Sequence, residues 1–424
     1  MKFIADFHLH SKFSRATSPK MDLENLDKWA KIKGIKVLGT SDFTRPEWFQ
    51  NLKEKLESVE PGLFKLKSTG SRLVDGTRFI LTTEISCIYS KKGRVRKIHI
   101  LIFAPDFQTV AKINTQLGWI GNLKADGRPI LGLDAKELAK IVLDVSENCL
   151  IVPAHLYTPW FSLFGSRSGF NSIEECFEDY SKYIYAGETG LSSDPPMSWR
   201  NSALDKITLI SNSDSHSVQK LGREANVFEG EELSYKSITE AIKNRGRTSA
   251  KLKLIYTIEF FPEEGKYHYD GHRNCGISLS PKESKKYNNI CPVCGRPLTI
   301  GVLNRVEELA DRPDGFKPEN AIPFKSLVPL EEIIAEALGV QPGTQQVLKE
   351  YQNLIEKFGS ELEVLLEISQ KELQSSTLPE ISEGIIRVRE GKVFTEPGYD
   401  GVYGKIRIFS KGEQKTLSQQ GTLF

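Results

Sequence analysis

The sequence predicts a mixed α/β chain with a large N-terminal α/β domain, a small metal-binding module and a mostly helical C-terminal region. Short apolar runs alternate with helical patterns over residues 1–247, which is typical of strands and helices around a mainly parallel sheet, open or closed as a barrel. Cysteines and histidines cluster between residues 268 and 294. Helical periodicity with proline and glycine punctuation then covers residues 329–374.

The N-terminal elements follow from the positions of apolar and capping residues. We expect a strand at residues 3–7 and a helix at 22–33, because Asp22 suits a helix start and Gly34 a helix end. A strand at 36–40 and a helix from Pro46 come next. The remaining strands are expected at 79–85, 98–103, 150–154, 183–187 and 207–210, with helices at 107–117, 134–144 and 173–183.

The pattern changes after residue 247. A strand is expected at 252–261, and residues 384–388 and 402–409 have a short β-like pattern. We therefore expect an α/β domain at 1–247, a metal-binding domain at 248–325, a mostly helical domain at 326–410 and a polar tail at 411–424.

Composition excludes some classes of protein. The 424 residues are 39% hydrophobic and 26% charged, which excludes a wholly disordered chain. No apolar run approaches the roughly 18 residues of a membrane span, and the start does not resemble a signal peptide, so we expect an intracellular, cytoplasmic protein without a membrane partner. Residues 243–296 hold about twice as many basic as acidic side chains, which fits a polyanion partner or a solvated basic surface.

Metal-type ligands stand at the ends of the predicted strands, where five of the seven histidines lie. In extended chain, side chains two apart point the same way, so His8 and His10 can meet one ion. The carboxyl ends of barrel strands converge on one face, so we expect the whole set to gather there. The set is His8, His10, Asp42, Glu84, His99, His155, Asp214 and His216.

This ligand set contains imidazoles and carboxylates but no thiolate, which favours divalent ions that keep open positions for water. Two or three ions such as Zn, Mg or Mn would activate water and clamp both oxygens of a phosphoester. The sequence therefore predicts metal-dependent phosphoester hydrolysis. The alternative is a set of unrelated structural histidines.

A second ligand group has different chemistry. His272 and Cys275 form an HxxC pair, and Cys291 and Cys294 form a CxxC pair shortly after it. This spacing predicts a closed, tetrahedral structural zinc site, with His268 as a competing ligand. The three other cysteines stand among apolar neighbours and are expected to be buried thiols.

The strand-end motifs resemble those of the PHP (polymerase and histidinol phosphatase) family over about residues 1–245. The motifs are His8-Leu9-His10, Ser41-Asp42, Thr83-Glu84, His99, Pro153-Ala154-His155 and Ser213-Asp214-Ser215-His216. The resemblance implies a distorted (β/α)7 barrel in which Glu84 bridges two ions. Besides Glu84, the first ion would be held by His8, His10 and Asp214, and the second by His99 and His155. His216 would contribute to a third ion. Phe43 stands where that family usually has a histidine, so two or three ions are expected.

With the Cys/His element and the helical segment included, nearly the whole chain resembles the endonuclease Q family of DNA repair nucleases. The resemblance implies cleavage of double-stranded DNA on the 5′ side of a deaminated base (uracil, hypoxanthine or xanthine) or an abasic site. The damaged base would be flipped into a pocket. The alternatives are a small-molecule phosphatase of the PHP type, a structure-specific nuclease without deaminated-base specificity, and a non-catalytic binding module.

Further candidates complete the predicted site. Asp42, Glu188 and Asp194 are candidate catalytic carboxylates. Candidate contacts to DNA or to the lesion are Ser14, Arg15, Asn171, Trp199 and Arg200. The alternative for the loop after Glu188 is a structural role in which Trp199 fills the core.

The C-terminal tail ends in a short motif. Gln420, Leu423 and Phe424 resemble a shortened PCNA-interacting motif, which implies a sliding-clamp partner and a place near the nucleoid. A tail without a partner is the alternative.

Overall fold

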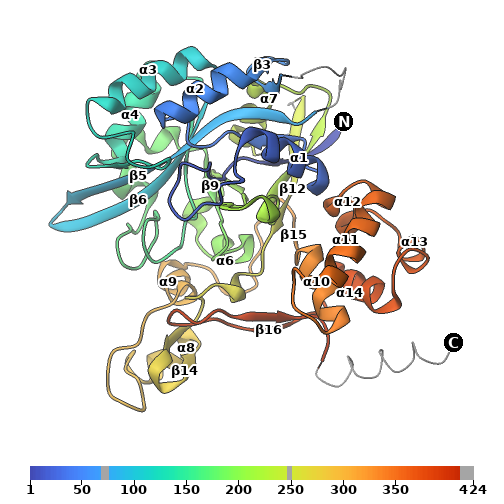
Figure 1. Ribbon diagram of the computed structural model, residues 1–424. Coiled ribbons are helices and arrows are strands. Elements are labelled where there is room, and N and C mark those ends of the chain that lie inside the picture. The colour runs from blue at the N-terminus through green and yellow to red at the C-terminus, as the bar shows by residue number, and fades with distance from the viewer. Residues whose placement is uncertain (68–75, 246–250, 411–424) are drawn as a thin grey trace, which may run out of the picture.

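The computed structural model describes residues 1–67, 76–245 and 251–410 (Figure 1). An α/β body holds most of the first 260 residues. Two smaller parts lie outside it in Figure 1: below it a Cys/His module, residues 266–300, around α8 (Pro281–Lys286) and β14 (Ile277–Leu279), and at its lower right the helices α10 to α14. The predicted mixed α/β fold with a helical C-terminal region is confirmed.

Within the described residues, seven strands surround the centre of the body. They are β1 (Lys2–Asp6), β2 (Val37–Gly39), β5 (Arg78–Lys91), β6 (Arg94–Ala104), β8 (Leu150–Pro153), β9 (Ala186–Glu188) and β10 (Thr208–Ile210). The β1–β2, β2–β5 and β9–β10 pairs are parallel, whereas β5–β6 and β6–β8 are antiparallel. A bridge between Leu9 and Ser215 brings the two ends together. The two antiparallel pairs distort the barrel, and the long β5–β6 hairpin extends well beyond the strands expected there.

Helices cover this sheet. They are α1 (Leu23–Lys33), α2 (Pro46–Lys55), α3 (Phe107–Gly118), α4 (Ala135–Val145), α5 (Ile173–Phe177), α6 (Pro195–Trp199) and α7 (Tyr235–Lys243). The predicted ends of α1 are confirmed, because the Asp22 carboxylate accepts from the Asn25 amide and Gly34 is left-handed with φ 86°. Cys87, Cys149 and Cys176 are buried, as expected.

The sheet continues past the expected domain boundary at residue 247. β11 (Ala225–Gly230) pairs with β1, β12 (Leu252–Glu259) pairs with β11, and β15 (Phe324–Ser326) pairs with β12. The chain therefore leaves the body near residue 260, after β12, and returns at β15. Three short strands, β3 (Leu56–Ser58), β4 (Phe64–Leu66) and β7 (Ile130–Leu131), also join the sheet.

The excursion between these two strands forms the Cys/His module and the helix α9 (Val302–Leu309). Its hairpin pairs β13 (Asp270–His272) with β14. The fully buried Asp270 carboxylate accepts hydrogen bonds from the Gly301 amide at 2.7 Å, from Asn304 at 2.5 Å and from Ser284. This one carboxylate therefore ties α8 and α9 to the hairpin.

The C-terminal helices are α10 (Leu330–Leu338), α11 (Gln345–Phe358), α12 (Glu361–Leu366), α13 (Gln370–Gln374) and α14 (Pro379–Arg389). The β-like reading of residues 384–388 is wrong, because they lie in α14. Ile381, Ile385 and Val388 are buried at helical spacing, so packing outweighs the β-branched composition.

The chain then forms a hairpin of β16 (Phe394–Glu396) and β17 (Lys405–Arg407), so the second β-like run is confirmed in part. Among the described residues, no helix has the length and apolar character needed to cross a membrane.

Candidate metal centre

His8 and His10 point into the carboxyl end of the barrel and are fully buried. Their Nε2 atoms lie 3.6 and 3.4 Å from the same Glu84 oxygen, Oε2. The His10 Nε2 is also 3.1 Å from Oδ1 of Asp214, and the His216 ring centroid lies 4.5 Å from that of His10. Ligand atoms from His8, His10 and Glu84, and from His10, Asp214 and His216, lie within 4.8 Å of one another.

The other oxygen of Glu84 faces a second pair of histidines. Glu84 Oε1 lies 2.8 Å from His99 Nδ1 and 3.1 Å from His155 Nε2, and these two nitrogens are 3.2 Å apart. Glu84 therefore has one carboxylate oxygen toward each histidine group, the geometry of a ligand shared by two ions.

The donor atoms fit divalent cations. The Nε2 atoms of His8 and His10 and the Oδ1 atom of Asp214 are buried, and although the two nitrogens lie 3.8 and 3.1 Å from that oxygen, none of the three makes a hydrogen bond of normal geometry. Buried polar atoms rarely stay unsatisfied, and a cation would satisfy all three. Imidazole and carboxylate donors suit Zn, Mn or Mg, and the set lacks the thiolates of a closed structural site.

Two buried carboxylates lie behind the histidines. Glu188 accepts from His8 Nδ1 at 3.0 Å, from the His155 amide at 2.9 Å and from Asn212 at 2.8 Å. Asp42 accepts from the Ser11 amide at 2.7 Å and lies 3.2 Å from His10 Nδ1. These contacts fix the rings with Nε2 toward the centre, as carboxylates behind metal-binding histidines do. Of the three predicted catalytic carboxylates, Glu188 and Asp42 thus stand behind the ligand groups, and Asp42, also predicted as a ligand, belongs to none of these groups among the described residues.

Opposite charges balance this crowded site. Burial acts to lower the pKa of His8, but Glu188, Glu84 and Asp214 outweigh it and hold the pKa well above its usual value. The pKa values of Glu84 and Asp214 lie well below normal, because neighbouring cationic groups outweigh the effect of burial. For His99 burial dominates and lowers the pKa to about 4. Positive charge at the centre is therefore favoured, whether from protons or from metal ions.

Three of these residues sit on left-handed backbone: Asp42 with φ 45°, His155 with φ 30° and Asp214 with φ 45°. Non-glycine residues rarely adopt this conformation, and each such residue costs about 1–3 kcal/mol. The three residues lie shortly after β2, β8 and β10, where this backbone conformation turns the chain and directs their side chains toward the centre.

The sequence did not point to Arg128. Its guanidinium lies 3.0 Å from Glu84 Oε2, and its loop is held to the first motif by a bond from the Gly127 amide to the Phe13 carbonyl. Arg128 lies in a loop without a recognisable motif, so only the fold brings it to the site.

The loop after Glu188 is packed against another part of the chain. Trp199 is 9% exposed and meets the Phe324 ring edge-on at 5.8 Å, and Arg200 pairs with Glu307 of α9 at 2.6 Å. The prediction that Trp199 and Arg200 contact DNA is therefore not supported by their placement, which matches the structural alternative.

Asp194 caps α6, where its carboxylate accepts from the Met197 amide. Burial raises the pKa of Asp194 to about 7, and the charge of Glu263 adds to the effect. Among the described residues it belongs to none of the ligand groups.

The remaining predicted contacts lie in different settings. The Ser14 hydroxyl donates to Asp42 at 2.8 Å, so it supports the site from within. Arg15 is exposed beside Asp126, at the rim. The Asn171 side chain accepts from Arg305 of α9, which also binds the Phe170 carbonyl.

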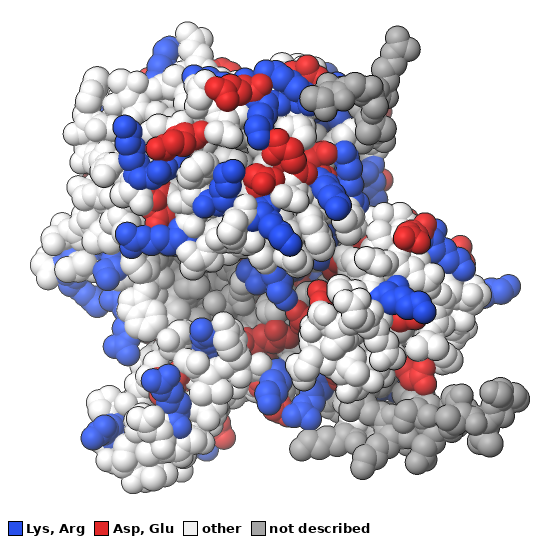
Figure 2. All heavy atoms as spheres, viewed as in Figure 1, with Lys and Arg blue, Asp and Glu red and all other residues white. Residues whose placement is uncertain are grey.

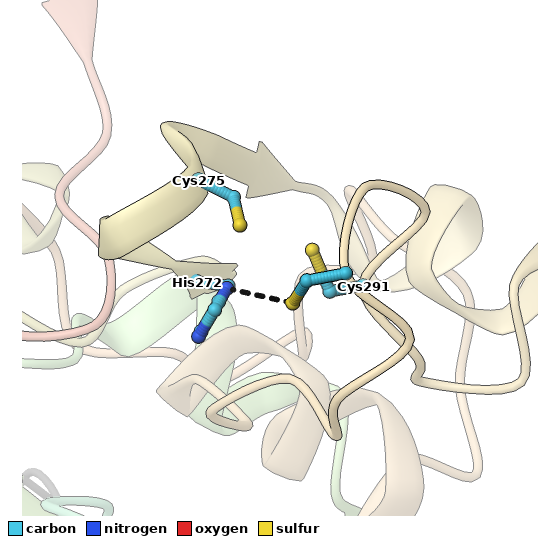
Figure 3. Close-up of side chains that lie close together, drawn as sticks. His272, Cys275 and Cys291 are labelled. Atoms are coloured by element: carbon cyan, nitrogen blue, oxygen red, sulfur yellow. Dashed lines mark hydrogen bonds between the residues drawn. The ribbon is translucent and has the colours of Figure 1, made fainter.

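The Cys/His module brings its predicted ligands together (Figure 3). Ligand atoms of His272, Cys275, Cys291 and Cys294 lie within 4.8 Å of one another, and His272 Nδ1 is 3.4 Å from the Cys294 sulfur. His268, the competing ligand, is buried outside this group. Burial acts to raise the pKa of Cys291, but backbone N–H groups outweigh it and lower the pKa to about 7. The metal-binding thiolate form is therefore populated near neutral pH. The donor set suits a structural zinc.

Relatives of the chain come from archaea and bacteria. Residues 329–392 match the family model of the MJ0043 C-terminal domain. An uncharacterised protein of Methanocaldococcus jannaschii, MJ0043, is 36% identical over 260 residues, which is 59% of this chain but 31% of that protein. The uncharacterised Bacillus subtilis protein YqxK is 29% identical over 96% of this chain and 99% of its own length.

Two solved structures match almost every element. The lesion-specific endonuclease PfuEndoQ of Pyrococcus furiosus has a TM-score of 0.85 at 30% identity, with 98% of this chain and 99% of that chain covered. The chain belongs to the endonuclease Q family. An endonuclease Q complex with a 27-mer duplex substrate, which carries an abasic lesion at the active site, gives 0.83 at 31% identity over 97% of this chain and 98% of that chain.

Proposed function

We propose that this endonuclease Q family member is a metal-dependent DNA repair endonuclease. It hydrolyses the phosphodiester on the 5′ side of a deaminated base (uracil, hypoxanthine or xanthine) or an abasic site in duplex DNA. The observation that carries the proposal is the Glu84 carboxylate, which faces two groups of buried, inward-pointing ligands. Family membership supplies the substrate class.

The chain's own residues would prepare the site for this reaction. His8 and His10 would hold one divalent ion and His99 and His155 another, with Glu84 shared between them, while Asp214 and His216 form a further ligand group with His10. Such ions lower the pKa of water and neutralise charge on a phosphate. Glu188 and Asp42 keep the imidazole rings aimed, and Arg128 places a guanidinium where it can meet a phosphate oxygen.

The outer surface suits a polyanion. Figure 2 shows a hollow between the body and the two smaller parts, with lysines and arginines around its border. The lysines of α8 add positive charge on the Cys/His module. A duplex held there would lose a damaged base from its stack more readily than a normal one.

Mapping of cleavage products on gels tests the proposal. Duplexes with one uracil, one inosine or one abasic site are incubated with Mg or Mn, beside an undamaged duplex. We expect one nick on the 5′ side of each lesion, with 3′-hydroxyl and 5′-phosphate ends, and no nick with Asp214→Asn. Turnover of small phosphomonoesters without nicking of these duplexes would favour the phosphatase alternative, and equal nicking of undamaged branched DNA would favour a structure-specific nuclease.

A sliding-clamp partner is part of the same proposal, and it rests on sequence. Gln420, Leu423 and Phe424 lie outside the described residues. Truncation after residue 410 should abolish retention on an immobilised clamp while nicking of free duplex stays unchanged. Equal retention of both proteins would exclude the tail as the contact.

A further inference from the structure

Three distant segments bring aromatic side chains together beside the metal centre. The first is the loop Thr158–Phe161, directly after His155. The second is residues 266–269, where the chain enters the Cys/His module, and the third is the turn 398–404 between β16 and β17, which Figure 1 shows below the body. We call Phe161, Trp160, Tyr267 and Tyr403 the aromatic row.

The row begins at the second histidine group. The Phe161 ring centroid lies 4.8 Å from that of His99, and the Phe161 carbonyl accepts from the His99 amide at 3.0 Å. The Lys97 ammonium lies 5.2 Å from the centroid of the Phe161 ring. Phe161 has φ 62°, a strained conformation for an aromatic residue, and its partly buried ring packs against His99 of the second histidine group.

Trp160 continues the row outward and is 39% exposed. Its indole meets Tyr267 edge to face, with centroids 5.5 Å apart. Its carbonyl accepts from the Thr158 hydroxyl, which also lies 2.9 Å from His155 Nδ1. One hydroxyl therefore links the position of Trp160 to a candidate metal ligand.

Tyr403 ends the row and is 66% exposed. The Gly401 amide donates to the Lys266 carbonyl at 2.9 Å, and the Lys266 ammonium lies 4.4 Å from the centroid of the Tyr403 ring. The Arg273 amide donates to the Asp400 carboxylate at 2.7 Å, and the Arg273 guanidinium lies beside Gly401 of the same turn.

We propose that the aromatic row is a stacking track for unpaired nucleotides of the substrate strand next to the cleaved phosphate, with Lys97, Lys266 and Arg273 as phosphate contacts. The proposal rests on the proposed function, because it assumes that the metal centre acts on a nucleic acid strand. Exposed rings interleaved with cations are the usual platform for single strands, since every base offers a flat face. In an intact duplex those faces are covered, which favours an unpaired partner over a duplex one.

Tryptophan fluorescence and binding to a short oligothymidylate test the track. The probe has no lesion, and the assay uses the metal-loaded protein. We expect the oligothymidylate to quench wild-type fluorescence, Trp160→Phe to lose most of that quenching, and Trp160→Ala to weaken binding roughly tenfold. The matched control is Trp119→Phe, which alters a more exposed tryptophan (81%) at the end of α3 and should keep the quenching.

Further variants separate the track from a general loss of structure. Tyr403→Ala changes an exposed ring on another segment and should weaken binding of the oligothymidylate by several-fold. Lys266→Ala should reduce the salt dependence of binding by about one ion. Unchanged melting temperature and metal content would show that each variant is folded.

Wild-type affinity for the oligothymidylate in both Trp160→Ala and Tyr403→Ala would overturn the track, as would quenching by an undamaged duplex alone. These results differ from a failure of the proposed function. If the protein binds single strands on the track but nicks no lesion duplex, the proposed endonuclease function is refuted and the track is retained. If the wild-type protein nicks lesion duplexes but does not bind single strands, the endonuclease function is retained and the track is refuted.

Discussion

The barrel centre and the Cys/His module are built in opposite ways. Barrel ligands come from residues 8 to 216, on strands brought together only by the complete fold, and most are buried. Module ligands come from residues 272 to 294, and Cys294 is exposed. The barrel scaffold has a large core, so we expect it to fold without an ion, whereas the short module has little core of its own. We therefore expect an ion in the barrel to act in catalysis and an ion in the module to stabilise its structure.

The largest effect should come from Glu84→Gln. Replacing the shared carboxylate weakens both ligand groups, so nicking should fall by more than the roughly 10–100-fold that follows loss of a residue behind a metal ligand. Metal analysis and nicking rates measure this, with the exposed Glu147→Gln as control. The fold should persist, although the melting temperature should fall because Glu84 is a buried partner of His8 and His10. A collapse of the fold would contradict the contrast between the two sites.

Cys275→Ser should disturb the structure of the Cys/His module and leave the barrel folded. We expect loss of one zinc per chain and rapid amide exchange across residues 266–300, because bound metal supplies the folding free energy of such a module. The barrel should keep its own protection. Val293→Ala, between Cys291 and Cys294 but 65% exposed, is the matched control. Protection of the module in the zinc-free variant would show that packing alone holds it.

Glu188→Gln should have a smaller effect on the barrel centre. The change weakens the acceptor at His8 Nδ1, so affinity for the metal should fall about 10–100-fold while the fold persists. Calorimetric titration with Mn or Zn measures this. Full affinity would mean that Glu188 does not orient His8.

The smallest effect concerns pH in the metal-free protein. The pKa values of His8 and His10 are raised above the usual 6.5, so their charged forms stabilise the fold fully below pH 6.5. This stabilisation is lost as pH rises through the raised values, and the melting temperature should fall. Metal affinity should rise over the same range, because protons and metal ions compete for the same nitrogens. If the melting temperature of the metal-free protein and the metal affinity both rose, or both fell, with increasing pH, this competition would be ruled out.

Much of the fold and the ligand set could be predicted, because local patterns carried the information. Strands show as apolar runs, the ends of α1 show as Asp22 and Gly34, and the ligands lie within strands, as Glu84 and His99 do, or shortly after them. The structure brings seven of the eight strand-end residues into three overlapping ligand groups, and the eighth, Asp42, contacts His10.

The rest depended on distant partners. Arg128 and Trp160 lie in loops without a pattern, and only the folded chain sets them beside Glu84 and Tyr267. Trp199 and Arg200 had the composition of a binding loop, but Phe324 and Glu307 cover them from more than a hundred residues away. The helix α14 forms because its apolar residues find a helical neighbour, against their β propensity.

The turn between β16 and β17 also bears on the timing of synthesis. The Gly398 amide binds the Glu263 carbonyl and the Gly398 carbonyl binds the Tyr269 amide, so residues made late clasp a segment made much earlier. During translation the segment that enters the Cys/His module lacks these two hydrogen bonds until residue 398 has left the ribosome. We therefore expect a nascent chain to fold its barrel first and to fix the position of the Cys/His module only when synthesis is nearly complete.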